Sequence, residues 1–163
     1  MTEGLKERML VAPPLTLAVA ESMTCGRVQA NVGAISGASD FFLGGVTAYT
    51  LEEKVRHLGV DREAAAPVNC VSAAVAEQMA RGACALFGAD VGIGTTGYAE
   101  PSAQWGAAAP FAWWAVAGRG PDGDWITRRG RVDCPGAGRT EAQERAASAA
   151  IAGLLEWLSV LGR

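Results

Sequence analysis

The sequence predicts a single α/β domain in which helices cover both faces of a mixed, mostly parallel sheet. Short apolar runs typical of buried strands alternate along the chain with segments whose apolar residues recur at helical spacing. The 163 residues suffice for one domain with its own core, and no repeat or linker interrupts the pattern. We therefore expect one three-layer α/β/α sandwich over residues 1–163, with residues 1–12 as a frayed or helical N-terminal segment.

The first half of the chain reads as two strands, each followed by a helix. Residues 15–20 (LTLAVA) form an apolar run that suits a strand buried on both faces, and the small polar residues 21–26 lead into a helix. Residues 41–49 (FFLGGVTAY) predict a second strand. The helix after it should end at Gly59 and carry a surface ion pair between Glu52 and Arg56.

The second half adds two long helices and a hairpin. Ser72 is placed to cap a helix with one apolar stripe, formed by Val75, Met79, Ala83, Leu86 and Phe87. Residues 91–96 predict another strand, and the turn residues 118–124 join residues 110–118 and 125–134 into an antiparallel hairpin. Thr140 and Gln143 have the spacing of a capping box at the start of a long C-terminal helix.

Composition excludes several classes of partner. The net charge of -3, with Lys and Arg scattered, gives no footprint for nucleic acid. No apolar run is long enough for a membrane span, so we expect a cytoplasmic protein. Four separated cysteines without a CxxC pair, together with a single histidine, argue against a zinc site, and no motif indicates a cofactor. We expect a small-molecule substrate.

Candidate catalytic residues gather where predicted strands end. Polar side chains follow three of the strands, and ligand sites in such sheets lie at the carboxyl ends of strands. These side chains are Ser22, Thr24, Tyr49 and Thr96. A hydroxyl nucleophile needs a base, and an isolated His57 is more typical of a surface residue. Lys54 is the alternative base, although composition alone favours a solvated helix lysine there. At this level the function stays open.

Five ordered motifs narrow the choice, because together they resemble the CinA C-terminal domain family. They are AESMTCG at residues 20–26, SGASDFF at 36–42, GGVTAYTLEEKVRHLGV at 44–60, VSAAVAEQMARGA at 71–83 and TGYAEP at 96–101. The match covers most of the chain. Stand-alone members of this family are nicotinamide mononucleotide amidohydrolases, which hydrolyse the carboxamide to a carboxylate and release ammonia.

The resemblance implies roles for individual residues. Ser22 would be the nucleophile, Lys54 its base or proton shuttle, and Tyr49 a hydrogen-bonding partner of the lysine. The substrate-binding residues implied are Thr24, Gly26, Ser39, Thr96, Gly97 and Arg139. Backbone amides of a turn would hold the oxyanion, and Arg139 is expected to contact the substrate phosphate. No metal or cofactor is implied.

Departures from the family pattern fall mainly on the substrate side. Glu100 replaces a glycine, and Ala112, Trp113 and Trp114 replace small, close-approach residues. We expect the bulkier pocket wall and the added carboxylate to disfavour an anionic phosphate by local repulsion. Three functions follow: deamidation of nicotinamide mononucleotide, hydrolysis of another small amide, or a non-catalytic binding module. The apolar C-terminal helix and the tryptophans also predict a homo-oligomer.

Overall fold

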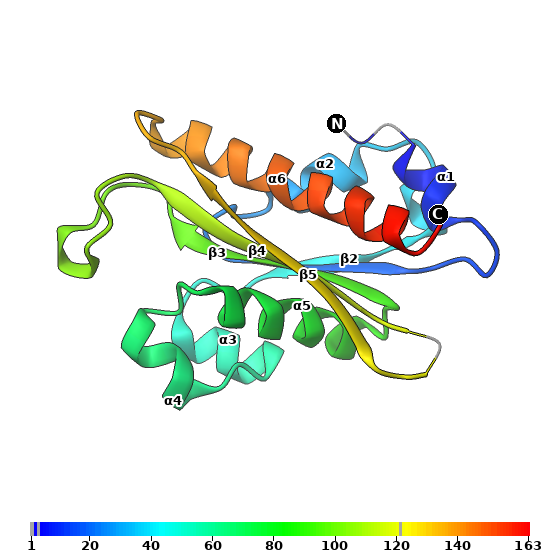
Figure 1. Ribbon diagram of the computed structural model, residues 1–163, viewed down its shortest axis with the longest axis horizontal. Helices are drawn as coiled ribbons and strands as arrows, with labels where there is room; N and C mark the ends of the chain where they lie inside the picture. Colours follow the sequence, from blue (N-terminus) through cyan, green and yellow to red (C-terminus); the bar gives the residue numbers. More distant parts are fainter. Residues whose placement is uncertain (1, 3, 121) are drawn as a thin grey trace.

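One five-stranded sheet forms the middle layer of the protein, as the computed structural model of residues 2, 4–120 and 122–163 shows (Figure 1). The strands are β1 (Leu17–Glu21), β2 (Phe42–Thr47), β3 (Val91–Tyr98), β4 (Phe111–Arg119) and β5 (Trp125–Asp133). Their spatial order is β2-β1-β3-β4-β5, with β1 parallel to β2 and β3 and with β4 antiparallel to β3 and β5. The predicted mixed sheet is confirmed, and its parallel core is β2-β1-β3.

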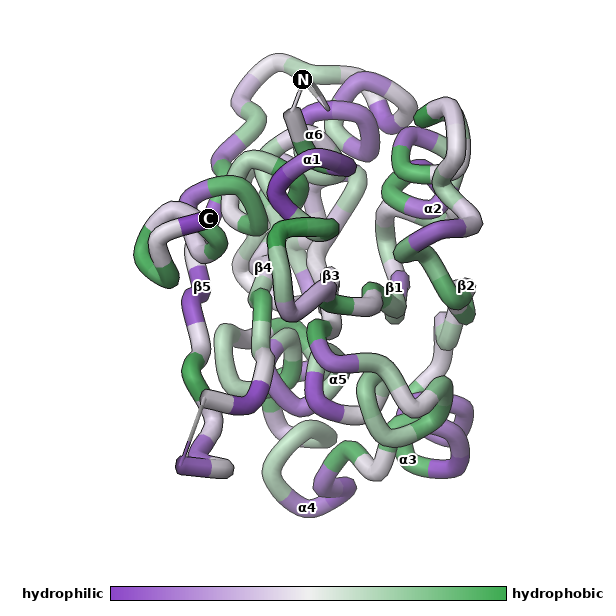
Figure 2. The backbone as a smooth tube through the Cα atoms, turned by 90° about the vertical axis from the view of Figure 1, so that its right-hand side faces the viewer, coloured by the Kyte–Doolittle hydropathy of each residue, from purple (hydrophilic) through white to green (hydrophobic). Residues whose placement is uncertain are grey.

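Helices cover both faces of this sheet, as the side view makes plain (Figure 2). On one face lie α1 (Leu5–Met9), α2 (Arg27–Gly33) and α6 (Arg139–Val160). On the other face lie α3 (Leu51–Leu58), α4 (Arg62–Ala65) and α5 (Ala73–Phe87). Three short 3₁₀ turns complete the connections: η1 (Ala38–Asp40), η2 (Ala66–Val68) and η3 (Ala103–Trp105). The three-layer sandwich expected from the sequence is thus confirmed.

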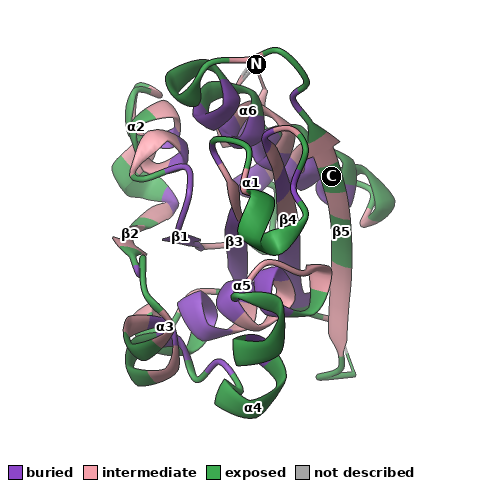
Figure 3. Ribbon diagram, turned by 90° about the vertical axis from the view of Figure 1, so that its left-hand side faces the viewer, coloured by how far each residue is buried: buried purple, intermediate pink, exposed green. Residues whose placement is uncertain are grey.

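Strand β1 is the most enclosed part of the sheet, and all five of its residues are buried (Figure 3). Leu17 and Val19 join the core that faces α6, whereas Ala18 and Ala20 join the core that faces α5. This alternation follows from the two-residue period of a strand. A strand with helices on both faces needs apolar residues at every position, which explains why the sequence shows a continuous run.

Helix α5 approaches the sheet closely because β3 carries glycines on the face it covers. A Cβ atom at Gly92 would overlap the backbone oxygen of Ala80, and one at Gly94 would overlap that of Ala76. Small residues on both elements therefore let the helix backbone rest on the strand. This contact fixes the distance between α5 and β3, and Thr96 lies near the carboxyl end of β3.

The predicted ends of two helices are confirmed. Ser72 accepts a hydrogen bond from the Val75 N–H at the start of α5, and Gly59, in the left-handed region with φ of 64°, ends α3. The segment 61–71 is less irregular than the sequence indicates, because it contains α4 and η2. Of residues 1–12, α1 is helical, whereas residues 1 and 3 lie outside the described residues.

Three local expectations are wrong. Glu52 pairs with Arg62 at 3.2 Å instead of with Arg56, because the start of α4 folds back beside α3. Leu86 does not belong to the apolar stripe of α5, since it is 46% exposed, whereas Phe87 packs against the core as predicted. Helix α6 begins after Gly138 without a side-chain cap, so the spacing of Thr140 and Gln143 does not mark a capping box. No helix among the described residues is long and apolar enough to cross a bilayer.

Replacing Gly94 by valine should destabilise the protein by about 1–3 kcal/mol, because the new side chain must push α5 away from β3. Gly33→Ala is the matched control. Gly33 is helical and has no atom within 4 Å of a new Cβ, so we expect a change of about 1 kcal/mol or less, in the stabilising direction. Urea denaturation of both variants measures the difference, and equal stabilities would contradict the close contact.

Candidate active site

A pocket of about 510 Å³ opens at the carboxyl ends of the three parallel strands. It contains six of the nine residues that the sequence analysis selected: Ser22, Tyr49, Lys54, Thr96, Gly97 and Arg139. Ser22 follows β1, Tyr49 follows β2, and Thr96 lies near the end of β3. The topology of the sheet therefore gathers residues that are far apart in the sequence, as expected for a doubly covered parallel sheet.

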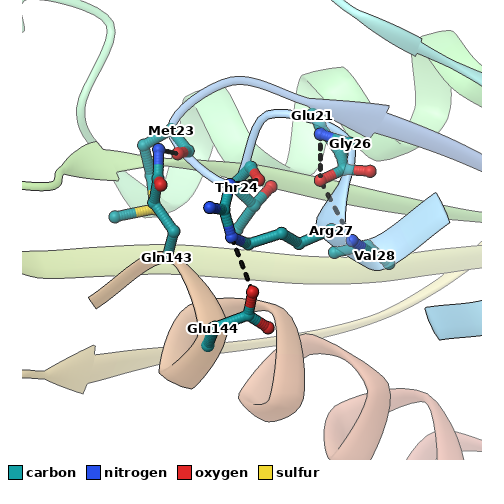
Figure 4. A network of polar contacts seen from close by, with 8 residues as sticks. All are labelled: Glu21, Met23, Thr24, Gly26, Arg27, Val28, Gln143 and Glu144. Carbon is teal, nitrogen blue, oxygen red and sulfur yellow. Dashed lines mark hydrogen bonds and ion pairs between the residues drawn. The ribbon is translucent and has the colours of Figure 1, made fainter. Parts of the chain in front are cut away.

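The turn after β1 is held by a buried carboxylate. Glu21 is fully buried, and its two carboxylate oxygens accept hydrogen bonds from the backbone N–H groups of Gly26, Val28 and Gln29 at 2.9–3.1 Å. Figure 4 shows the two bonds from Gly26 and Val28. These donors belong to the first turn of α2, whose free N–H groups favour an anion. One side chain thus fixes the ends of the turn that carries Ser22.

Helix α6 holds the same turn from its other side. Gln143 donates a hydrogen bond from Nε2 to the Met23 carbonyl at 2.9 Å, and this contact is buried. The Arg27 guanidinium pairs with Glu144 at 2.8 Å, which links α2 to α6 (Figure 4). Gln143 therefore has a use that its sequence spacing did not indicate: it orients the residue next to Ser22.

Lys54 lies directly beside Ser22. Its Nζ donates hydrogen bonds to Ser22 Oγ at 3.0 Å and to the Tyr49 carbonyl at 2.9 Å. The lysine is only 2% exposed, although the sequence favoured a solvated side chain. Burial lowers its pKa, because desolvation penalises the ammonium form, and the nearby Cys70 thiol acts in the opposite direction. The burial arises because α3 turns Lys54, together with Leu51, toward the pocket.

Tyr49 connects the serine–lysine pair to a surface ion pair. Its carbonyl accepts from Lys54, and its phenol oxygen accepts from Arg139 Nη2 at 2.9 Å. Arg139 Nη1 in turn donates to a Glu100 carboxylate oxygen at 2.7 Å. The hydrogen bond that Arg139 donates to Glu100 is the main reason that the pKa of Arg139 is raised. Tyr49 thus contacts the lysine through its backbone, while its side chain points to Arg139.

Two further polar contacts shape the rim of the pocket. Thr96 is buried and donates from Oγ1 to the Cys70 carbonyl at 2.7 Å, which ties the segment before α5 to β3. Asn69 donates to the Tyr98 hydroxyl at 3.1 Å. The Thr96 hydroxyl donates its proton to this contact, so its role is to hold Cys70 and Thr96 together in the pocket wall.

Three of the expected substrate-binding residues are not brought to the pocket. Ser39 lies in η1 ahead of β2, and because β2 runs parallel to β1 this is the opposite end of the sheet from Ser22. Thr24 is buried beneath the turn and shares a hydrogen bond with Thr95 at 2.7 Å. Gly26 begins α2, and its N–H is bonded to Glu21.

The expected bulky wall is also wrong. Ala112, Trp113 and Trp114 lie on β4, where they pair with β3, and none of them lines the pocket. Trp114 packs instead over two small positions, Gly130 and Gly153, at which a Cβ would overlap its ring. Residues 99–102 form the wall, and Glu100 is its charged member.

His57 does not line the pocket. His57 is on the surface of α3 and contacts Glu53 at 2.8 Å, as the sequence indicated for an isolated histidine. Within residues 2, 4–120 and 122–163, no group of three or more His, Cys, Asp or Glu side chains is placed to hold a metal ion.

Sequence reasoning missed Glu21 and Gln143. Glu21 ends an apolar strand immediately before the Ser22 turn, and an acidic residue at such a position is the one signal that could have marked it. Gln143 had no comparable signal, because its partner Met23 is 120 positions away. Contacts of this range follow from the packing of α6 across the sheet.

Fold and site together define an α/β sandwich with a buried serine–lysine pair at the carboxyl ends of its parallel strands. Residues 3–158 match the CinA C-terminal domain, and the chain therefore belongs to that family.

Relatives and solved structures agree with this assignment. A protein of Moorella thermoacetica is 48% identical over 99 residues, which cover 61% of this chain and 24% of that protein. A CinA-like protein of Picosynechococcus sp. is 47% identical over 89 residues, covering 55% and 21%. The chain thus spans less than a quarter of these curated relatives. The crystal structure of a CinA superfamily protein from Enterobacter cloacae superposes with a TM-score of 0.86 at 29% identity, covering 96% of this chain and 89% of that one.

Replacing Lys54 by methionine should change how stability depends on pH. Because the folded-state pKa of Lys54 is lowered, the unfolded chain binds more protons between that pKa and about 10.4, and the stability of the unsubstituted protein rises with pH across this window. The free energy of unfolding of Lys54→Met, relative to that of the unsubstituted protein, should therefore decrease from pH 7 to pH 10. Urea denaturation at both pH values tests this, with Lys6→Met as the control for losing a partly exposed lysine. A difference that is independent of pH would refute it.

Proposed function

We propose that the protein is an amidohydrolase that converts nicotinamide mononucleotide to nicotinate mononucleotide and ammonia. The observation that carries this proposal is the 3.0 Å contact between Ser22 Oγ and the buried Nζ of Lys54 inside a pocket. Family membership is consistent with an amidohydrolase, and the resemblance of the site motifs supports the choice of substrate. The mechanism follows from the chemistry of this pair.

The first half of the reaction transfers the acyl group to the enzyme. A neutral Lys54 amine accepts the Ser22 hydroxyl proton while Oγ forms a bond to the carboxamide carbon. The tetrahedral intermediate then expels ammonia, and the ammonium group of Lys54 returns the proton to the leaving nitrogen. The lowered pKa of Lys54 supports this role, because it increases the fraction of neutral amine near neutral pH.

The second half hydrolyses the ester on Ser22. Water attacks the acyl carbon and gives a proton to Lys54, and the carbon–oxygen bond to Ser22 breaks as Oγ takes that proton back. The products are a carboxylate and the free enzyme. The Met23 N–H adjoins the nucleophile and has no hydrogen-bond partner among the described residues, which makes it a candidate donor to the oxyanion.

The Tyr49 carbonyl gives Lys54 a fixed orientation throughout the cycle. The carbonyl accepts a hydrogen bond from Nζ, and this bond holds the amine so that it also faces Ser22 Oγ. Glu21 and Gln143 act as positioning residues, because they hold the turn on both sides of the serine without lining the pocket. Activity in this scheme needs the turn and the lysine, and it needs no bound metal.

Ser22→Ala and Lys54→Met should each lower kcat/KM for nicotinamide mononucleotide by about 10²–10⁴-fold, because each removes a partner in proton transfer. Ammonia release by purified protein is the measurement. Ser36→Ala, which alters an exposed serine between α2 and η1, at the opposite end of the sheet from Ser22, should match the unsubstituted rate. Full turnover by Ser22→Ala would exclude the nucleophile, and no turnover by the folded unsubstituted protein would exclude the substrate.

A further inference from the structure

We propose that Glu100 is a specificity-determining residue, whose carboxylate occupies Arg139 and thereby weakens the binding of phosphorylated amides relative to what a free Arg139 would allow. The identity of the amide rests on the proposed function, whereas the competition for Arg139 does not. Glu100 would then act as a tethered competitor of any phosphate that enters the pocket.

The position of Arg139 relative to the serine–lysine pair is set by one residue. Tyr49 touches Lys54 with its carbonyl and Arg139 with its phenol, so the two ends of the pocket are separated by one tyrosine side chain. Ser22 and Arg139 line the same pocket, so a substrate whose amide lies at Ser22 can extend to Arg139. A substituent there contacts Arg139 before any other cation.

The pocket offers a phosphate few cationic partners. Among the described residues that line it, Lys54 and Arg139 are the cations and Glu100 is the carboxylate. Lys54 is buried and already donates to two oxygens. Both terminal nitrogens of Arg139 are also engaged, one by Glu100 at 2.7 Å and one by Tyr49 at 2.9 Å.

A phosphate at Arg139 must displace Glu100 or lie beside it. If the phosphate displaces Glu100, breaking the Glu100–Arg139 ion pair weakens its binding. If the phosphate lies beside Glu100, two anions share one cation and repel each other. An uncharged hydroxyl at the same place meets neither penalty, because it can accept or donate a hydrogen bond without repulsion. Glu100 thus discriminates by charge rather than by size.

The pair is exposed enough to be replaced without unfolding the protein. The side chains of Arg139 and Glu100 are 48% and 61% exposed, and exposed pairs of this kind contribute little to stability. Screening by salt also limits the effect, so we expect changes of about five- to tenfold in affinity at low ionic strength, falling as salt is added.

Binding of ribose 5-phosphate, with ribose as the uncharged control, tests the competition without amide chemistry. By titration calorimetry, Glu100→Gln should bind ribose 5-phosphate about five- to tenfold more tightly than the unsubstituted protein, and Glu100→Gln with Arg139→Gln should lose this gain. Asp133→Asn is the matched control, because it frees an exposed arginine, Arg131, away from the pocket. No gain, no measurable binding to Glu100→Gln, or a gain that survives loss of Arg139 would overturn the proposal.

Turnover then separates this proposal from the proposed function. The unsubstituted protein should deamidate both nicotinamide riboside and its 5′-phosphate, and Glu100→Gln should shift the ratio of kcat/KM values toward the phosphate by about fivefold or more. If neither amide is hydrolysed, the proposed function fails while the calorimetric result still decides the role of Glu100. An unchanged ratio in an active Glu100→Gln variant counts against the specificity role.

Discussion

The buried carboxylate of Glu21 is the constraint on which the site depends. A fully buried carboxylate is costly unless its oxygens are satisfied, and here three backbone N–H groups at the start of α2 satisfy them. The same contacts join the end of β1 to α2 across a five-residue turn. Ser22 lies in that turn, so the hydrogen bonds of Glu21 fix the position of the Ser22 hydroxyl, although the hydroxyl does not take part in them.

Lys54 poses the opposite electrostatic problem. No carboxylate of residues 2, 4–120 or 122–163 pairs with its amine, whose polar partners are the Ser22 hydroxyl and the Tyr49 carbonyl. Hydrogen bonds to neutral oxygens compensate only part of the lost hydration, which is why burial lowers the pKa of this side chain. The fold thus holds a lysine in surroundings that suit a base, at the expense of some stability, and such a compromise is typical of functional sites.

Tyr49 joins two parts of the pocket that differ in electrostatic character. At its backbone, the pocket is buried and holds the serine–lysine pair. At its phenol, the pocket meets solvent, and an arginine is balanced by a carboxylate. The proposed roles of the serine–lysine pair in chemistry and of Glu100 in selectivity are therefore separated in space, which allows Glu100 to vary without disturbing Ser22. Glu100, which departs from the family pattern, is therefore placed so that it can affect ligand binding without moving Ser22 or Lys54.

The sequence by itself determined the layered α/β fold, because the buried β1 run and the helical stripes depend on local periodicity. Its motifs also selected six residues that meet in one pocket. Tertiary structure alone decided that Lys54 is buried, that Ser39 lies at the far end of the sheet and that Trp114 supports α6. It also decided that Glu100 pairs with Arg139, 39 positions away, and that Gln143 supports Met23 across 120 positions. Burial and pairing of this kind depend on how distant elements pack, and no local pattern of residues encodes that arrangement.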